Sequence, residues 1–97
     1  MASSIIGARR SAVEVVYDIL STCDNGGINK TAVMYRCNLS YDQLRRYLSV
    51  LCDERLVLEN GERLFEITPA GQKALRRMSV AVKTLRDLRR DLAPATA

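Results

Sequence analysis

The first part of the chain has apolar residues that recur with the period of an α-helix. Between residues 9 and 23 they follow the spacing i, i+3, i+4, i+7, which is typical of a helix with one buried face. Glu14 and Asp18 lie one turn apart, and we expect them on the opposite, solvated side. Residues 24–27, Asp-Asn-Gly-Gly, end the helix, because glycine tolerates a helix-terminating conformation. The predicted buried face contains Val13, Val16, Tyr17, Leu20 and Cys23.

Two shorter helices are predicted next, each with its own start signal. Asn29 is a suitable N-cap for a helix over residues 30–37, and Asn38 can end that helix in a left-handed conformation. Ser40 can cap the following helix, because Gln43 three residues later completes a capping box. Only two residues separate the helices, which predicts a helix-turn-helix with a recognition helix over residues 40–53.

A period of two replaces the helical period after residue 55. Two strand-like runs, 56–59 and 62–67, flank Asn60-Gly61, and Asn-Gly is the strongest short signal for a β-hairpin. A two-residue turn would place Leu56 opposite Phe65. The predicted core-facing residues are Leu56, Leu58, Phe65 and Ile67.

The last predicted helix is long and carries a heptad pattern. Thr68 and Pro69 supply an N-cap and a first helical residue, and Pro94 ends the helix after about residue 92. About 25 residues would span about 37 Å. A single small core cannot cover that length, so the apolar stripe predicts a dimer with a second copy of the chain. The predicted interface consists of Ala74, Met78, Ala81, Leu85, Leu88 and Leu92.

These elements predict a mainly α fold with a small β-hairpin: a winged helix-turn-helix plus a long C-terminal coiled-coil helix. We expect a flexible tail at 1–8, the winged helix-turn-helix domain at 9–68, a dimerisation helix at 69–93 and a tail at 94–97. The 97 residues suit one domain, and a hydrophobic content of 47% is too high for disorder.

The charge is unevenly distributed along the chain. Residues 1–68 carry eight Lys/Arg against nine Asp/Glu, whereas residues 69–97 carry seven against two. The overall charge of +4 permits a nucleic-acid partner through phosphate contacts. The sequence has no apolar run of about 18 residues and no secretory signal, so we predict no membrane association and a cytoplasmic, nucleoid-associated protein.

The chemistry of the chain predicts no catalytic site, no metal site and no cofactor. It contains no histidine, no Gly-rich phosphate loop and no C-x-x-C pair, so we predict neither an enzyme nor a small-molecule substrate. The cysteines at 23, 37 and 52 are interpreted as reduced thiols in the core.

The segment Asn29–Tyr41, N-K-T-x-x-M-Y-R-x-N-L-S-Y, resembles the archaeal ten-kilodalton winged-helix proteins, as do the Asn-Gly hairpin with its E-I-T-P-A-G end and the long last helix. The resemblance covers residues 9–92. It implies an archaeal, double-stranded DNA-binding protein that dimerises through an antiparallel coiled coil and organises chromatin or regulates transcription. The chain departs from the family at Arg55, where a glycine is common, and in an acidic hairpin tip that contains Glu59 and Glu62.

Arg45 and Arg46 are the leading candidates for DNA contact, because both fall on the outward face of the recognition helix. Gln43 could pair with adenine or serve only its cap. A helix N-terminus and the helix that crosses the DNA backbone add phosphate contacts. The full predicted DNA-binding set is Lys30, Thr31, Ser40, Tyr41, Gln43, Arg45, Arg46, Ser49 and Arg63. The alternative hypothesis is a protein-interaction module, in which the winged helix is a scaffold and the coiled coil recruits a partner.

Overall fold

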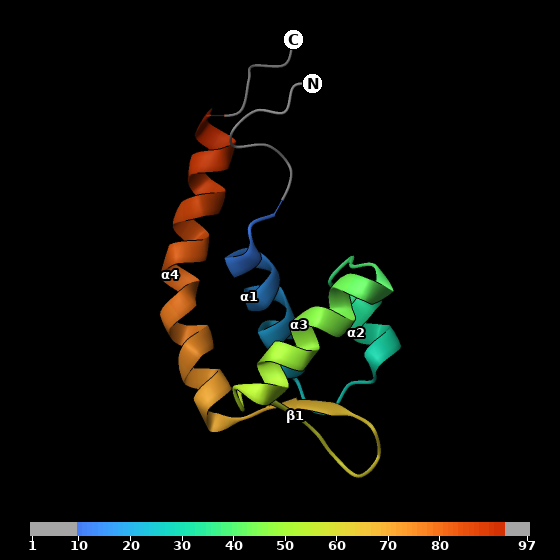
Figure 1. The fold of residues 1–97 in the computed structure, drawn as a ribbon. Helices are drawn as coiled ribbons and strands as arrows, with labels where there is room; N and C mark the ends of the chain where they lie inside the picture. The colour runs from blue at the N-terminus through green and yellow to red at the C-terminus, as the bar shows by residue number, and fades with distance from the viewer. Residues whose placement is uncertain (1–9, 93–97) are drawn as a thin grey trace.

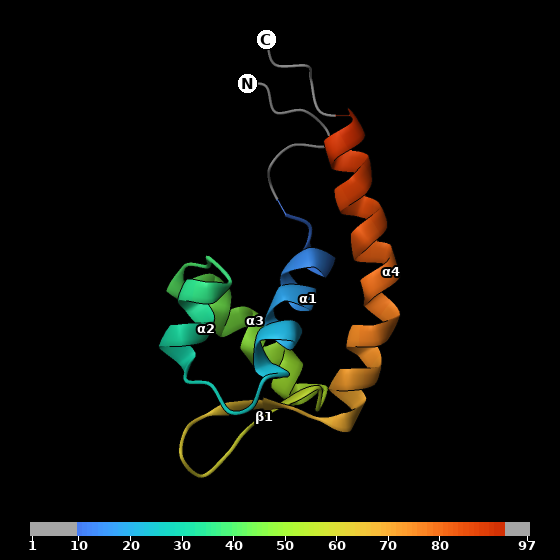
Figure 2. The same cartoon turned by 180° about the vertical axis from the view of Figure 1, so that it is seen from behind.

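The computed structural model describes residues 10–92, and both predicted tails, 1–8 and 94–97, lie outside this range. The elements, in chain order, are α1 (Ala12–Cys23), α2 (Lys30–Arg36), α3 (Tyr41–Asp53), β1 (Val57–Glu59), β2 (Phe65–Ile67) and α4 (Pro69–Leu92). Two opposite views show α1 between α4 on one side and α2 with α3 on the other (Figures 1 and 2). The predicted mainly α fold with one hairpin and a long last helix is confirmed.

Side chains close to each helix start set where the helices begin. The Ser40 hydroxyl accepts a hydrogen bond from the Gln43 backbone N–H at 3.2 Å, and the Gln43 side chain accepts from the Ser40 N–H at 3.0 Å. This is the predicted capping box. The N-terminal caps are provided by Ser11, Asn29, Ser40 and Thr68.

The buried face of α1 differs from the predicted one. Val15 is buried, whereas Val13 is exposed, and Glu14 is the one charged side chain buried among the described residues, at 1% exposure. The physical reason is that α1 is covered from two sides, by the helix-turn-helix and by α4. The side chains that form the core together with α1 are Val33, Leu44, Leu48, Leu51, Val57 and Phe65.

The register of the hairpin is also different from the prediction. Val57 pairs with Ile67 and Glu59 with Phe65, so five residues rather than two form the loop. Asn60 causes the difference, because its side-chain oxygen accepts from the backbone N–H groups of residues 62 and 64 and so builds a wider turn. Val57 and Phe65 therefore face the core, and Leu58 is exposed.

The end of α3 keeps the shape that a glycine would give it. Arg55 has φ 60°, in the left-handed region that glycine adopts most readily. The Leu56 N–H donates to the Leu51 carbonyl at 2.9 Å, which closes the helix end as in a Schellman motif. The first strand thus leaves α3 in the direction typical of a helix end with glycine, although the residue is arginine.

The start of α4 is held tightly against the hairpin. Gly71 is buried, and a Cβ atom at this position would lie 2.1 Å from the Leu56 carbonyl oxygen. Only glycine allows this approach. Within residues 10–92, none of the helices combines the length and the apolar character needed to cross a membrane.

Candidate nucleic-acid interface

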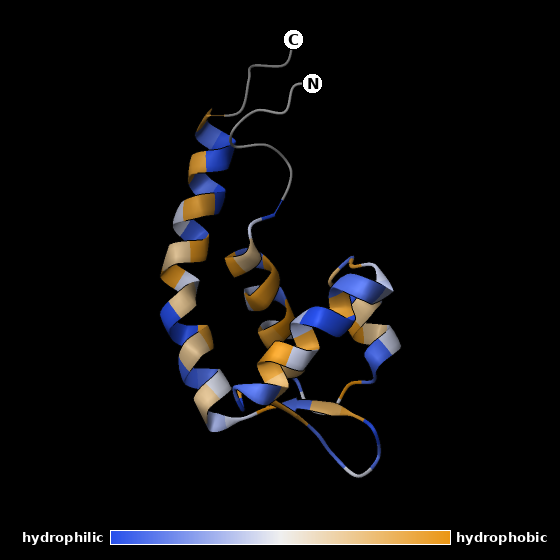
Figure 3. Cartoon of the chain, viewed as in Figure 1, coloured by the Kyte–Doolittle hydropathy of each residue, from blue (hydrophilic) through white to orange (hydrophobic). Residues whose placement is uncertain are grey.

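The face of α3 that points away from the core carries the predicted arginines. Leu44, Leu48 and Leu51 are buried, whereas Arg45 and Arg46 are exposed. Hydrophilic residues cover the N-terminal half of α3, and hydrophobic residues are concentrated further along it (Figure 3). This half of the helix therefore offers a polar surface to a partner.

The two arginines leave α3 on different sides. Arg45 lines a groove of about 200 Å³ together with Lys30, Ser49 and Glu59, so this groove lies between α2, α3 and the hairpin. Arg46 instead borders a groove of about 440 Å³ between α1 and α3. Arg45 also lies 3.7 Å from the Asp42 carboxylate, in an exposed ion pair that salt would screen.

The start of α2 joins the same surface. The Lys30 ammonium lies 5.8 Å from the centre of the Tyr41 ring, a cation–π contact that ties α2 to the beginning of α3. Thr31 is exposed beside them. Tyr35 is 74% exposed on α2 and was not predicted as a contact residue. An exposed aromatic residue could have been recognised from its position outside the apolar period.

The remaining predicted contact residues occupy less favourable positions. The side chains of Ser40 and Gln43 both accept hydrogen bonds in the capping box, which leaves the Ser40 hydroxyl hydrogen and the Gln43 amide nitrogen free to donate. Arg63 is exposed in the hairpin loop next to Glu62. Glu59 faces the groove beside Arg45, so this side of the interface is partly acidic.

The predicted dimer stripe divides into two halves. Ala74 and Met78 pack partly against the core of their own chain. Further along α4, Leu85, Leu88 and Leu92 are 37%, 44% and 61% exposed, and Ala81 is exposed as well. The C-terminal half of the stripe is thus the part that remains uncovered.

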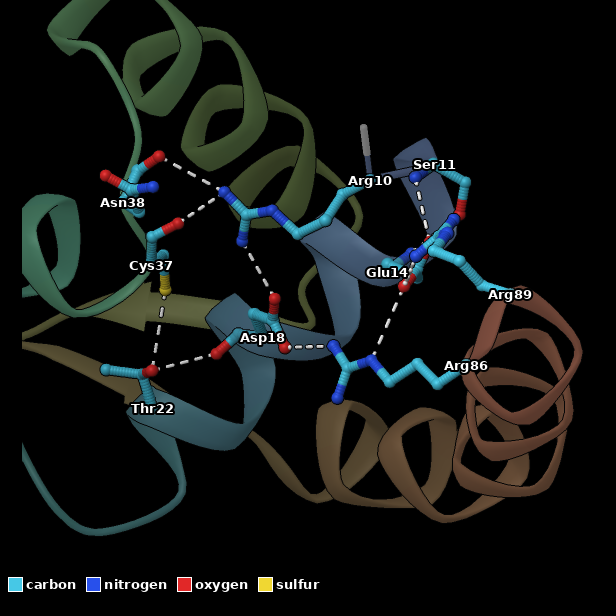
Figure 4. Close-up of polar contacts among 9 residues, drawn as sticks. All are labelled: Arg10, Ser11, Glu14, Asp18, Thr22, Cys37, Asn38, Arg86 and Arg89. Atoms are coloured by element: carbon cyan, nitrogen blue, oxygen red, sulfur yellow. Dashed lines mark hydrogen bonds and ion pairs between the residues drawn. The ribbon is translucent and has the colours of Figure 1, made fainter. Parts of the chain in front are cut away.

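Sequence reasoning missed a cluster of charged residues between α1 and α4. We call Arg10, Glu14, Asp18, Arg86 and Arg89 the ion-pair cluster (Figure 4). Glu14 and Asp18 were expected in solvent. Their i, i+4 spacing on α1 was visible in the sequence, but nothing in it identified the partner arginines on α4.

Two of the three cysteines lie in the core, as the sequence predicted, whereas Cys52 is only partly buried. Cys23 and Cys37 are buried, and burial raises the pKa of the Cys23 thiol to about 12. These thiols are neutral at physiological pH and contribute packing. No group of three or more potential metal ligands occurs within the described part of the chain.

A helix-turn-helix followed directly by a two-stranded hairpin defines a winged-helix protein. The sequence agrees, because a family model described as winged helix-turn-helix matches residues 9–86. The chain belongs to the winged helix-turn-helix family.

Similar proteins occur in an archaeon. An uncharacterized protein of Methanocaldococcus jannaschii is 34% identical over 65 residues, which cover 67% of this chain and 66% of that protein. A second uncharacterized protein of the same organism is 25% identical over 76 residues, or 78% of this chain. The match spans only 36% of that second relative.

Two solved structures share the fold. One is Sso10a-2, a DNA-binding protein from Sulfolobus solfataricus, with a TM-score of 0.70 and 24% identity over 81% of this chain and 85% of that one. The other is the PcaV transcriptional regulator from Streptomyces coelicolor, with a TM-score of 0.69 and 19% identity over 94% of this chain and 67% of that one. The predicted resemblance to archaeal ten-kilodalton winged-helix proteins is therefore confirmed in fold.

Proposed function

We propose that this protein binds double-stranded DNA as a homodimer and acts as a chromatin-organising protein or a transcriptional regulator. The observation that carries the proposal is the pair Arg45 and Arg46 on the exposed, N-terminal half of α3. In a helix-turn-helix this part of the second helix enters the major groove. The DNA-binding and transcription-regulating proteins that share the fold support it.

The surrounding residues add contacts to phosphate. Lys30 and Thr31 lie at the start of α2, which crosses the DNA backbone in this motif, and Tyr41 with Ser49 completes the exposed surface of α3. Arg63 is placed in the hairpin loop, where a wing can reach the backbone. A DNA partner would place the protein at the nucleoid, and the proposed role is binding without catalysis.

Binding to duplex DNA is expected to weaken steeply as salt rises. Lys30, Arg45, Arg46 and Arg63 supply four cationic groups per chain, and a dimer that uses most of them would lose about 10³-fold in affinity between 50 and 200 mM salt. A gel-shift titration of a duplex of mixed sequence at several salt concentrations measures this slope. The absence of any shift at about 50 mM salt would rule out DNA binding, because phosphate-driven affinity is greatest at low salt.

Dimerisation is expected to depend on the exposed half of α4. Replacing Leu88 by Asp places one negative charge from each protomer in the proposed apolar interface. The dimer dissociation constant should rise by about 100-fold or more. Sedimentation equilibrium would then give the 10.9 kDa monomer at concentrations where the unmodified protein is dimeric. Lys83→Ser on the exposed outer face of α4 is the control and should leave the dimer intact. An unmodified protein that is monomeric at micromolar concentration would contradict the dimer.

The alternative is a protein-interaction module. The near-neutral charge of residues 1–68 and the acidic residues around the hairpin favour it. In that case the exposed stripe of α4 would bind a different protein, and duplex DNA would not displace that protein.

A further inference from the structure

The ion-pair cluster joins three parts of the molecule through a continuous set of contacts (Figure 4). Arg89 donates from both terminal nitrogens to the two carboxylate oxygens of Glu14, at 2.7 Å each. Arg86 donates to Glu14 at 3.4 Å and to Asp18 at 2.8 Å. Two residues of α4 are thereby fastened to two residues of α1.

The contacts continue from α1 to the turn of the helix-turn-helix. Asp18 accepts a second bond from Arg10 at 2.8 Å. The other terminal nitrogen of Arg10 donates to the backbone carbonyls of Cys37 and Asn38, at 2.5 and 3.1 Å. These carbonyls belong to the turn that directly precedes the cap of α3, so the cluster connects α4 to the element that orients the recognition helix.

The contribution of the contact between Glu14 and Arg89 to the stability of the fold depends on how deeply the two side chains are buried. Glu14 is 1% exposed, and the Arg89 side chain is 23% exposed. A buried ion pair often stabilises a fold no more than apolar side chains of the same volume, because both charges lose water. Its two parallel hydrogen bonds form in one relative position only, however, since a shift of one helical residue, about 1.5 Å, would break them. The pair therefore fixes a relative position of α1 and α4 that apolar side chains of the same volume would not fix.

The ion-pair cluster contacts the part of α4 that has no fully buried side chain to hold it on the core. Val82 is the last residue of α4 that is fully buried against the rest of the chain. Beyond it, Arg86 and Arg89 hold α4 on α1, while Leu85 and Leu88 on the neighbouring face remain exposed. The ion-pair cluster thus provides the polar contacts between α1 and the part of α4 that carries the proposed dimer stripe.

We propose that Glu14 is a positioning residue: its contact with Arg89 fixes α4 relative to α3, and so fixes the distance between the two recognition helices of the dimer. This inference rests on the proposed dimeric DNA-binding function. It assigns to Glu14 an effect on where the second recognition helix meets DNA, without any contact between Glu14 and DNA.

The test replaces the ion pair by apolar side chains and measures geometry in the absence of DNA. A genetically encoded spin label at Tyr35, an exposed position, reports the distance between the two protomers by pulsed electron paramagnetic resonance. The double variant Glu14→Leu with Arg89→Met should remain folded, with a urea midpoint within about 0.5 M of the unmodified protein. Its interprotomer distance distribution should become at least about twice as wide, and its affinity for a duplex that spans both recognition helices should fall about tenfold.

A matched control distinguishes the effect of this particular ion pair from the general effect of removing a charge from α4. Asp87→Asn removes an exposed ion pair with Arg90, one turn away on the same helix, and should leave the distance distribution narrow. A narrow, unchanged distribution in the Glu14→Leu, Arg89→Met variant would overturn the inference. The absence of any interprotomer distance in the unmodified protein would instead overturn the dimer on which it rests. If the double variant fails to fold, Arg89→Lys keeps a positive charge opposite Glu14 but removes the two parallel hydrogen bonds, and an unchanged distribution in that variant overturns the inference equally.

Discussion

Replacing Arg45 and Arg46 together by alanine is expected to weaken the binding of duplex DNA by about 100-fold or more. A contact of arginine with a base edge or phosphate contributes about 1–3 kcal/mol, and a dimer loses four such contacts. Neither side chain is buried, so the fold should persist. Gel shifts at constant salt, with circular dichroism to verify the fold, measure the effect.

The same variant also separates contacts with phosphate from contacts with bases. Loss of phosphate contacts should lower affinity equally for all duplexes and flatten the salt dependence, whereas loss of base contacts should act on preferred sequences. The control replaces Arg76, Lys83 and Arg90 of α4, which are exposed on the outer side of that helix. If only the control abolishes binding, α3 is not the recognition helix.

The stability of the protein is expected to fall in acid through Glu14. The hydrogen bonds from Arg89 lower the pKa of this carboxyl from 4.5 to about 2, against burial, which raises it. The folded-state pKa is thus below the unfolded value. The contribution to stability is complete above pH 4.5 and is lost as the pH falls toward 2, and the difference corresponds to about 3 kcal/mol.

Urea unfolding between pH 7 and pH 2, at one protein concentration, measures this contribution. Glu14→Gln should lower the free energy of unfolding by about 3 kcal/mol at pH 7, because it removes the buried carboxylate that Arg89, itself only partly buried, neutralises. The variant should then lose less stability than the unmodified protein on acidification. Asp87→Asn, at an exposed pair, should change the pH 7 value by less than about 1 kcal/mol. If the Glu14→Gln variant and the unmodified protein lose the same stability on acidification, other carboxyl groups determine the acid sensitivity.

The helix starts could be predicted because their signals are local. Asn29 and Ser40 each bond to a backbone group three residues ahead, so a short stretch of sequence contains the whole motif. The hairpin was recognised for the same reason. Its register was not predicted, because the Asn60 side chain competes for the backbone and widens the turn.

The ion-pair cluster could not be predicted from local patterns. Glu14 and Arg89 are 75 residues apart in the sequence, and a carboxylate on a helix is usually solvated. Only the packing of α4 on α1 brings them together. The exposed positions of Arg45 and Arg46 on α3 followed directly from the helical period, whereas their DNA contacts remain a prediction.

The separation between Glu14 and Arg89 also has a consequence for folding. Contacts between neighbouring residues close short loops, whereas this contact closes nearly the whole described chain and carries the larger entropic cost. The helix-turn-helix, with its caps three residues from their acceptors, can therefore form before α4 docks. In a chain emerging from the ribosome, α2 and α3 are synthesised before Arg89, so we expect the long helix to be the last element to dock.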